Sequence, residues 1–392
     1  MEEDAGTSST ILVTVAGGNF VQLGSRFLIG AVVPLLLVHF ETTRATIGLA
    51  LTGMWAVYAL TQFPSGMLAD RYSERVVVLV ALVATCCGVI FVALSPTIAL
   101  FSIAALILGV GSGLFFAPAA TLVTRLYAKR GQALSALTAS GALAGLVFPA
   151  VGGVVGARNG WRIAVSLSAV ATSVVIVATV LSVPSMTPTN SDRDLRSLLD
   201  FHRHWSFITR PDVAYSLALG SIGAFTFQGI SSFFPTFLIE FRGLGTEFAG
   251  VAFGLMFGIS AVAQPIAGRL SDRFTRNTAI GASMGLTLVG FLVLLVVSTP
   301  IGLAVGLGLL GIGISWPGPV QARFFDIMSQ TERGYGYGLV RTVYMLIGAT
   351  SSVIVGVLVD LRGWVTGIES LVVVLTVGLV LIGFNWVQDR GL

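Results

Sequence analysis

The sequence is poor in charge. Only 10% of its 392 residues are Asp, Glu, Lys or Arg, whereas soluble domains carry about 25% charged residues. The hydrophobic share is 55%, and the mean hydropathy is +0.92. Because so few charges cannot cover a water-exposed surface, this composition excludes a soluble domain and predicts an all-α polytopic membrane protein.

Cysteine and histidine are also scarce, with two and three residues. Cys86 and Cys87 are adjacent, so they cannot close a useful loop, and no Cys, His or carboxylate cluster has metal-ligand spacing. The sequence contains no hydrolytic triad and no phosphate-binding loop. We therefore expect no cofactor, no bound metal and no enzymatic activity. The first ten residues lack the basic stretch of a cleavable signal peptide, so the first span should remain in the protein.

Apolar segments separated by polar, Gly or Pro breaks are each long enough to cross a bilayer, which takes about 20 residues. Twelve such segments lie near 11–40, 46–68, 76–94, 97–124, 132–157, 163–183, 213–240, 247–267, 278–298, 300–325, 335–358 and 364–387. The polar stretch 184–212 divides them six and six, with a short amphipathic helix expected near 195–201. The predicted organisation is a six-helix bundle at 1–183, a cytoplasmic linker at 184–212 and a second six-helix bundle at 213–392.

The basic residues indicate an orientation and not a nucleic-acid partner, because they form no run or stripe. Of 22 Lys and Arg residues, fifteen fall in the even-numbered loops and the tail, five in the other loops, and Arg26 and Arg341 within spans. Since basic loops stay in the cytoplasm, both termini are predicted to be cytoplasmic in a multi-pass protein of the cell membrane. The expected partners are the lipid bilayer and a small-molecule substrate, and the chain is expected to be a monomer.

The two halves of the chain repeat each other. TQFPSGMLADRYSER at 61–75 matches AQPIAGRLSDRFTRN at 263–277 with an offset of 202 residues, and Gly160-Trp161 matches Gly363-Trp364 with an offset of 203. Such an internal repeat predicts two structurally similar bundles related by an axis along the membrane normal.

At these residues the chain resembles the major facilitator superfamily, whose loop between spans two and three carries G-x-L-x-D-R-x-G-R-[KR]. The matching residues are Gly66, Leu68, Asp70, Arg71 and Arg75 in the first copy and Gly268, Leu270, Asp272 and Arg273 in the second. The departures are Ser73, Glu74 and Thr275. The resemblance covers essentially the whole chain and implies secondary transport by alternating access.

The repeated loops also suggest gating on physical grounds. Glycine at positions 66 and 268 would let two helix ends approach closely, and a carboxylate beside an arginine can pair with a neighbouring helix end in one conformation and release it in another. The predicted gating residues are Gly66, Asp70, Arg71, Arg75, Gly268, Asp272 and Arg273. The alternative is that Asp70 and Asp272 only cap or anchor their loops.

Arg26 lies in the middle of the first apolar segment. A guanidinium stays charged and costs about 2.5–3.5 kcal/mol at the centre of a membrane helix, so it must face protein or water. Asn19, Gln22 and Arg26 fall at i, i+3 and i+7, which predicts a polar stripe along the wall of a substrate cavity. Alternatively, Arg26 packs helices together with its donors on backbone carbonyls.

The repeat assigns a counterpart to Arg26. Residue 228, at the offset of 202, is Gln228, so the cavity is predicted to be cationic on one wall and neutral on the other. Arg341 in the eleventh span adds a second cation and shares a helix face with Tyr337 and Tyr344. Snorkelling of Arg341 to the interface is an equally good interpretation.

Aromatic residues could close the site, although most aromatics in membrane helices only pack. Tyr58 in the second span and Trp316 in the tenth lie where pathway helices would place them, and SWPGP at 315–319 should interrupt the tenth helix. The predicted substrate-binding residues are Arg26, Gln22, Asn19, Gln228, Arg341, Tyr344, Trp316 and Tyr58.

Acidic residues are nearly absent from the spans, where only Glu369 is found, close to one end. A proton-driven carrier usually buries a carboxylate or histidine at mid-membrane, so strong proton coupling is not expected. The sequence predicts a secondary transporter for a small organic anion, a carboxylate held by Arg26 and Arg341, working as a uniporter or exchanger. The alternatives are efflux of amphipathic or neutral compounds, as in multidrug antiporters, and a non-transporting membrane sensor.

Overall fold

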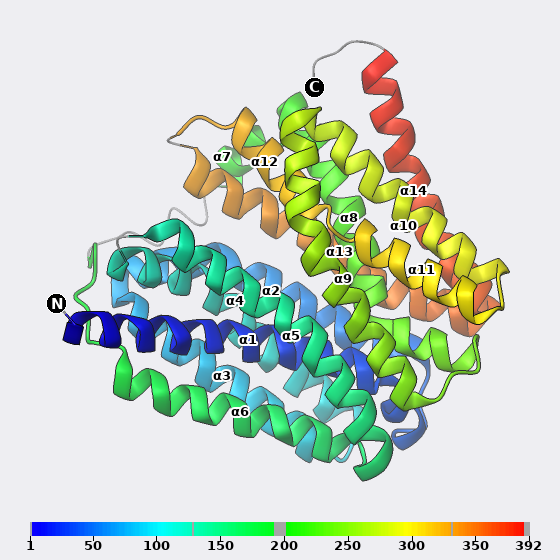
Figure 1. Ribbon diagram of the computed structural model, residues 1–392, viewed down its shortest axis with the longest axis horizontal. Helices are drawn as coiled ribbons and strands as arrows, with labels where there is room; N and C mark the ends of the chain where they lie inside the picture. The colour runs from blue at the N-terminus through cyan, green and yellow to red at the C-terminus, as the bar shows by residue number, and fades with distance from the viewer. Residues whose placement is uncertain (1, 128, 192–200, 331, 388–392) are drawn as a thin grey trace.

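The computed structural model describes residues 2–127, 129–191, 201–330 and 332–387, and all regular elements among them are helices (Figure 1). The helices are α1 (Glu2–His39), α2 (Arg44–Tyr72), α3 (Glu74–Leu94), α4 (Ile98–Leu126), α5 (Arg130–Asn159), α6 (Trp161–Ser182), α7 (Phe201–Ile208), α8 (Pro211–Glu240), α9 (Thr246–Arg273), α10 (Arg276–Val296), α11 (Pro300–Gly313), α12 (Pro317–Ile327), α13 (Arg333–Arg362) and α14 (Trp364–Val387). In this part of the chain, twelve spans are long and apolar enough to cross a membrane, as the sequence predicts.

The spans form two bundles, α1–α6 and α8–α14 (Figure 1). The closest packing within the first bundle joins α4 to α2 and α3, and α1 to α5. Between the bundles, α2 packs against α13, α5 against α9, and α1 against α8. At the α5–α9 crossing a Cβ on Gly153 would lie 2.7 Å from the Cα of Gly250, so only glycine allows the two backbones this approach.

The sequence repeat is visible in the helix ends. Ser73 and Thr275, 202 residues apart, each accept a hydrogen bond from the backbone N–H three residues later, at the starts of α3 and α10. Gly160 and Gly363 join the last two spans of each bundle with φ of 89° and 84°, in the region that favours glycine. The two bundles therefore share local turns as well as helix order.

The tenth span is interrupted as the sequence predicts, between α11 and α12. Pro317 and Pro319 have no N–H to donate to the carbonyls one turn earlier, so the helix breaks over residues 314–316. Trp316 stands at this break and is buried.

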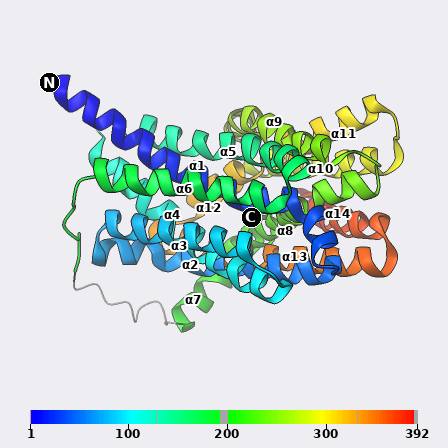
Figure 2. The same cartoon turned by 90° about the horizontal axis from the view of Figure 1, so that it is seen from below.

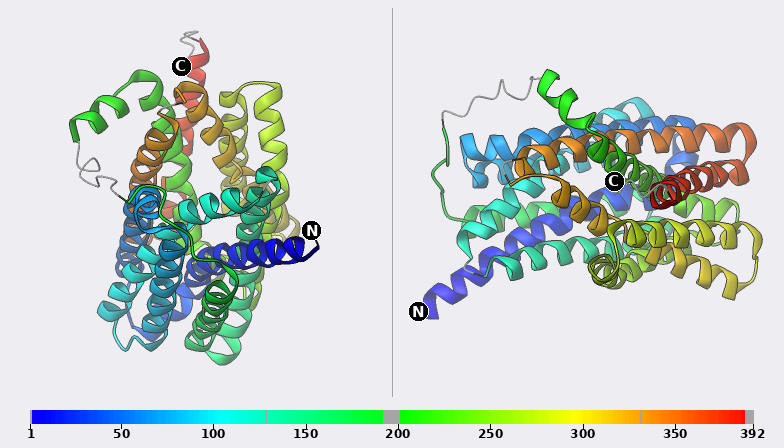
Figure 3. Two further views of the ribbon diagram at one scale, coloured as in Figure 1. Left: turned by 90° about the vertical axis from the view of Figure 1, so that its left-hand side faces the viewer. Right: turned by 90° about the horizontal axis from the view of Figure 1, so that it is seen from above.

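The linker helix lies beside the spans rather than among them (Figures 2 and 3). The short helix expected near 195–201 falls largely outside the described residues; α7 begins at Phe201. Phe207 is buried on the C-terminal bundle, where a Cβ on Gly336 would lie 2.6 Å from its ring, while Trp205 is exposed. The first turns of α1 extend beyond the neighbouring helices (Figure 2).

Successive spans run in opposite directions, so the turns between them gather at two opposite ends of the molecule. We call the end that holds the turns near 73, 128, 275 and 330 the termini end, and the end that holds those near 42, 96, 160, 243, 298 and 363 the far end. Toward the termini end, α10 and α14 point away from α3 and α6 (Figure 1). The two bundles are thus splayed at the termini end.

Candidate functional site: two arginines between the bundles

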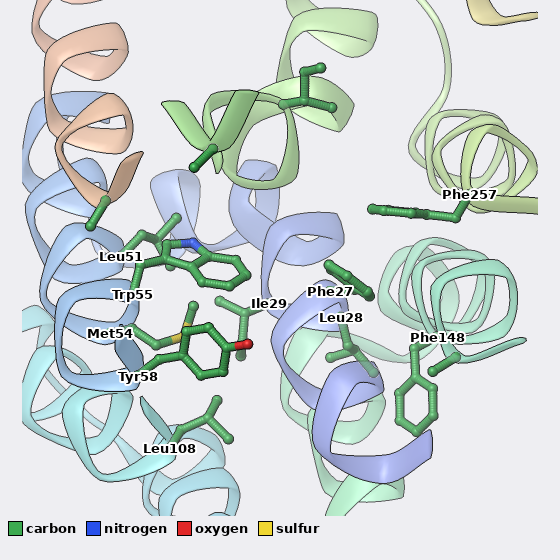
Figure 4. Close-up of a cluster of buried hydrophobic side chains, with 14 of the residues drawn as sticks. Phe27, Leu28, Ile29, Leu51, Met54, Trp55, Tyr58, Leu108, Phe148 and Phe257 are labelled. Atoms are coloured by element: carbon green, nitrogen blue, oxygen red, sulfur yellow. The ribbon is translucent and has the colours of Figure 1, made fainter. Parts of the chain in front are cut away.

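Arg26 lies on α1 with only 4% of its surface exposed. Its Cζ is 4.0 Å from the centroid of the Tyr58 ring and 5.1 Å from that of Trp55. Both rings project from α2 toward α1, with the Tyr58 hydroxyl directed into the space between the helices (Figure 4). The Arg26 Nε–H donates to the carbonyl of Gln22 at 3.4 Å. Aromatic faces therefore stabilise this buried cation.

Arg341 approaches from the other bundle, on α13, and is half-buried. Its Cζ lies 5.8 Å from the ring centroid of Phe116 on α4. Tyr58 lies within electrostatic range of both Arg26 and Arg341, and Tyr337 and Tyr344 also lie within electrostatic range of Arg341. The two guanidinium groups thus lie within electrostatic range of the same tyrosine, where the two bundles meet.

The charges of this centre are not balanced by acids. Among the described residues, neither Arg26 nor Arg341 forms an ion pair with a carboxylate, and the electrostatic partners of both are tyrosines and each other. The Nε of Arg341 is buried without a hydrogen-bond partner in the described structure. A buried donor without a partner is costly, and a ligand acceptor would satisfy it.

Asn19 and Gln22 do not share the environment of Arg26. Asn19 Nδ2 donates to the Leu137 carbonyl at 2.7 Å, on α5. Gln22 Nε2 donates to the Ala81 carbonyl at 3.2 Å, and its Oε1 accepts from Thr85 Oγ1 at 2.6 Å, both on α3. These amides join helices of the N-terminal bundle, so the three residues contact three different neighbours. A role for Asn19 and Gln22 in substrate binding stays a prediction.

Gln228 and Tyr344 lie where α8 meets α13. Gln228 is fully buried, and its Nε2 donates to the Met345 carbonyl at 3.2 Å, while its Oε1 has no partner among the described atoms. Tyr344 stacks on Phe324, with ring centroids 6.2 Å apart. The structure therefore puts the neutral counterpart of Arg26 beside the helix that carries Arg341.

Trp316 contacts Tyr344 edge to face, with ring centroids 6.2 Å apart. It also packs on Gly223 of α8, where a Cβ would lie 2.5 Å from the indole. Its Nε1 is buried without a partner in the described residues, and its side chain lines a small, mostly apolar cavity together with Thr226 and Thr287. Tyr58, Arg341, Tyr344 and Trp316 therefore form a continuous series from the N-terminal bundle into the C-terminal one.

The sequence did not predict that Arg323 is buried. Arg323 is one of the fifteen basic residues that the sequence assigns to the even-numbered loops and the tail, but it lies in α12 with 7% of its surface exposed. Its Nε donates to Ser216 Oγ and an Nη to Asn277 Oδ1, each at 2.9 Å. The hydrophobic segment ends near Phe325, and its polar neighbours come from distant helices, so no local pattern indicated burial.

The repeated gating loops lie at the termini end. Asp272 pairs with Arg276 of the same loop, whose Nε also donates to Asp326 at 2.8 Å. A Cβ on Gly66 or on Gly268 would meet no atom within 4 Å. The close helix approach expected at these two glycines is therefore absent from this conformation, because the bundles diverge at this end.

The first gating loop is held by the start of the linker. The Asp70 carbonyl accepts from the Asn190 N–H at 2.9 Å, and Arg75 donates to Ser185 Oγ at 2.7 Å. Beside it, Glu74 is fully buried and pairs with Arg125 at 2.5 Å. Residue 276, the repeat counterpart of Glu74, is an arginine that pairs with Asp326. At this position the C-terminal bundle therefore has the basic residue where the N-terminal bundle has the acidic one.

At the far end, ion pairs join the two bundles. Arg44, at the start of α2, pairs with Glu240 of α8 at 2.5 Å and with Asp360 of α13 at 3.1 Å. Asp360 also accepts from the backbone N–H of Ala45 at 2.7 Å, and so caps α2 from the other bundle. The Trp364 Nε1–H donates to the same Glu240 carboxylate at 2.9 Å. The far end is thus closed by charged contacts.

The comparisons with known proteins follow this architecture. The chain belongs to the Major Facilitator Superfamily, whose model matches residues 15–317 and 247–390. It is a membrane-embedded secondary transporter of that superfamily for a small molecule, in a family whose members are not enzymes. The predicted family and twelve-helix fold are confirmed.

Individual relatives are distant. The chain is 30% identical over 131 residues to the "Probable hexose phosphate transport protein" of Chlamydia trachomatis serovar D, and 28% identical over 131 residues to its namesake in Chlamydia pneumoniae. These matches cover 33% of this chain and only 29% of each relative.

Solved structures agree with the fold over nearly all of the chain. A bacterial homologue of the human lysosomal transporter Spinster, inward-facing and unoccupied, has a TM-score of 0.80 at 16% identity and covers 96% of both chains. The nucleoside transporter NupG has a TM-score of 0.78 at 14% identity, covering 96% of this chain and 99% of that one. At these identities the likeness concerns the fold alone.

Proposed function

We propose that this chain carries a small organic anion, a carboxylate in the first instance, across the cell membrane by alternating access, as a uniporter or an exchanger. The observation that carries the proposal is the pair of arginines, Arg26 and Arg341, both within electrostatic range of Tyr58 and neither paired with a carboxylate among the described residues. Planar guanidinium groups bind carboxylate or phosphate oxygens in pairs, which makes an anion the matching ligand.

The relatives support an anionic substrate. Their printed name, hexose phosphate transport protein, denotes a negatively charged cargo. Those matches cover only a third of the chain, so the two arginines are the stronger support for an anionic substrate. A bound anion would balance the charge of Arg26, whose described contacts are aromatic rings and a backbone carbonyl.

The conformation supports a direction for the opening. The far end is closed by Arg44, Glu240 and Asp360, and the helices diverge at the termini end. With both termini in the cytoplasm, as the basic loops favour, the end at which the helices diverge would face the inside. The bundles 1–183 and 213–392 would rock about the site, and one chain holds every residue of the centre, so we propose a working monomer with 184–212 as its linker.

The test is uptake into proteoliposomes of the purified chain. A panel of radiolabelled succinate, lactate and glycerol phosphate, together with a cationic dye, distinguishes organic-anion transport from efflux of amphipathic compounds. Uptake of the organic anions and not the dye is expected. Transport of the dye alone would establish the multidrug alternative, and no transport of any compound would favour a sensor.

Arg26 supplies the matched variants. Arg26→Lys keeps the charge but loses the planar fork, and Arg26→Ala loses both. Both should abolish saturable anion binding while the protein remains monodisperse, and Arg269→Gln, on the exposed end of α9, should bind as the wild type does. Full binding by Arg26→Lys would rule out recognition through the paired donors.

A further inference from the structure

A tryptophan corner occurs in both bundles at the far end. In the C-terminal bundle it joins Glu240, the last residue of α8, to Trp364, the first residue of α14. The Trp364 Nε1–H donates to the Glu240 carboxylate at 2.9 Å, and the Cζ of Arg44 lies 6.0 Å from the centroid of the indole ring. This corner therefore contains an indole N–H, an acid that accepts from it and a cation that pairs with the acid.

The N-terminal bundle has the equivalent corner between His39, the last residue of α1, and Trp161, the first residue of α6. The two rings meet edge to face, with centroids 5.5 Å apart. The Cζ of Arg162 lies 4.4 Å from the centroid of the Trp161 ring, and its Nη2 donates to the Ser95 carbonyl, just after α3, at 2.8 Å. This corner also has a tryptophan and a cation, but a histidine takes the place of the acid.

Trp161 lacks the acceptor that Trp364 has. Its side chain is 5% exposed, and its Nε1 is buried without a hydrogen-bond partner in the described structure. The acid nearest to His39 in the sequence, Glu41, is exposed and forms no ion pair among the described residues. Buried donors are nearly always hydrogen-bonded, and two basic side chains lie beside this one. An anionic oxygen is the group that would match all three.

The three helices that meet at this corner are exposed to lipid. Val38, Leu94 and Ile163, which lie beside the corner in sequence on α1, α3 and α6, are 78%, 70% and 50% exposed. Exposed aliphatic side chains on membrane spans contact acyl chains, and a tryptophan at the end of a span lies at the level of the headgroups. Headgroup phosphates are therefore the anionic oxygens nearest to the corner in a membrane, and dissolved phosphate reaches it from the water.

We propose that the corner of His39, Trp161 and Arg162 binds a phosphate group, from a lipid headgroup or from solution, through the indole N–H and the two basic side chains. The indole N–H is covered in this structure, so binding requires a side chain to move. His39 is exposed, and its described contacts are with aromatic rings, so it is able to turn away from the indole. Bound phosphate would join the ends of α1 and α6, as Glu240 joins those of α8 and α14. The site lies apart from the two-arginine centre and does not depend on the transported substrate.

The experiment follows the indole N–H signals of the whole chain by NMR, with isotope-labelled tryptophan in dodecyl maltoside, a detergent without phosphate. The chain has 6 tryptophans, and Trp161→Phe and Trp364→Phe identify the two signals of interest. Short-chain phosphatidylglycerol should shift the Trp161 signal saturably. The Trp364 signal should stay in place, because Glu240 already accepts from that indole. A diacylglycerol with the same acyl chains, which lacks the phosphate, should shift neither signal.

Inorganic phosphate distinguishes the two sources of the ligand. A Trp161 shift with inorganic phosphate, at concentrations like those at which the lipid saturates, would identify a site for dissolved phosphate. A shift with the lipid alone would identify a headgroup site, and either result supports the proposal. No shift with either compound, the same shift with the diacylglycerol, or an equal shift of the Trp364 signal would overturn it.

Variants of the corner supply the causal test. His39→Glu introduces the carboxylate that Glu240 provides in the other bundle, so it should occupy the indole N–H and lower the affinity for phosphate at least about tenfold. Arg162→Gln should also weaken binding at least about tenfold, as expected for the loss of a charge-assisted hydrogen bond. Arg362→Gln, exposed at the far end of the other bundle, should bind as the wild type does.

Wild-type affinity in both His39→Glu and Arg162→Gln would refute the site. Because His39 is exposed, its replacement remains informative if the arginine variant does not fold.

Discussion

Removing Arg44 should open the far end of the carrier. In the structure Arg44 joins the N-terminal bundle to Glu240 and Asp360 of the C-terminal one, with 31%, 29% and 19% of the three side chains exposed. In Arg44→Gln both carboxylates lose their cation and repel each other when the end is closed. The population of the far-end-open state should therefore increase.

The magnitude follows from the number and exposure of the pairs. Exposed ion pairs contribute about 0.2–1 kcal/mol each, and partly buried, hydrogen-bonded ones lie at the upper limit. The two ion pairs of Arg44 should therefore stabilise the closed far end by about 1–2 kcal/mol. Their loss corresponds to a five- to thirtyfold shift between the closed and open populations. High salt should reduce the difference between Arg44→Gln and the wild type, because dissolved ions screen these partly exposed charges.

Arg158 provides the matched control. It also pairs across the bundles, with Glu247 at 2.8 Å, but 65% and 46% of these side chains are exposed. Arg158→Gln should therefore shift the populations by less than about threefold, since such exposed pairs contribute a few tenths of a kcal/mol.

Spin-label distances report the populations. Labels at Leu94 and Val296, exposed at the far end of each bundle, in a background with Cys86 and Cys87 replaced by serine, would give one main distance in the wild type. A second, longer distance should grow in Arg44→Gln. An unchanged distribution, or an equal change in Arg158→Gln, would refute the role assigned to Arg44.

Three further predictions concern the loops and the coupling. Asp70→Asn and Asp272→Asn should slow exchange far more than they weaken binding, and equal losses of rate and affinity would contradict a gating role. A pH step across the vesicle should alter the initial rate but not the final accumulation of substrate; accumulation that follows the step, collapses with a protonophore and is lost in Glu240→Gln would show proton coupling at the far end. A backbone hydrogen bond from Ser329, and then Arg210, lower the pKa of Glu332. This carboxylate thus stabilises the fold above its unfolded pKa and stops doing so as pH falls through the lowered value, so Glu332→Gln should lower the melting temperature at pH 7 but not in acid that protonates the wild type.

Arg26 shows how far sequence reasoning reaches. Its depth in the first span follows from hydropathy alone, and its need for protein or water follows from its permanent charge. Its partners do not follow. Asn19, Gln22 and Arg26 share a helix face by spacing, yet their side chains contact α5, α3 and α2, respectively. Long side chains reach whichever polar group a neighbouring helix offers, and that depends on helix packing.

Glu74 gives the complementary case. The motif comparison marks it only as a departure from a basic position. The structure shows it fully buried on Arg125, at the place where the other bundle pairs Arg276 with Asp326. For the acidic and the basic residue of such an ion pair to exchange places, both residues must change together. A motif that covers only one of the two positions does not reveal the other.

The sequence by itself determined the twelve spans, the internal repeat, the superfamily and the presence of cations within the membrane, because hydropathy, spacing and charge are local properties of the chain. Only the tertiary structure decided that Arg341 faces Tyr58 and Arg26, that Asn19 and Gln22 join helices, and that the far end is closed by Arg44. These facts depend on how the helices pack within and between the bundles. The contacts join residues 59 to 316 positions apart, and no local pattern encodes them.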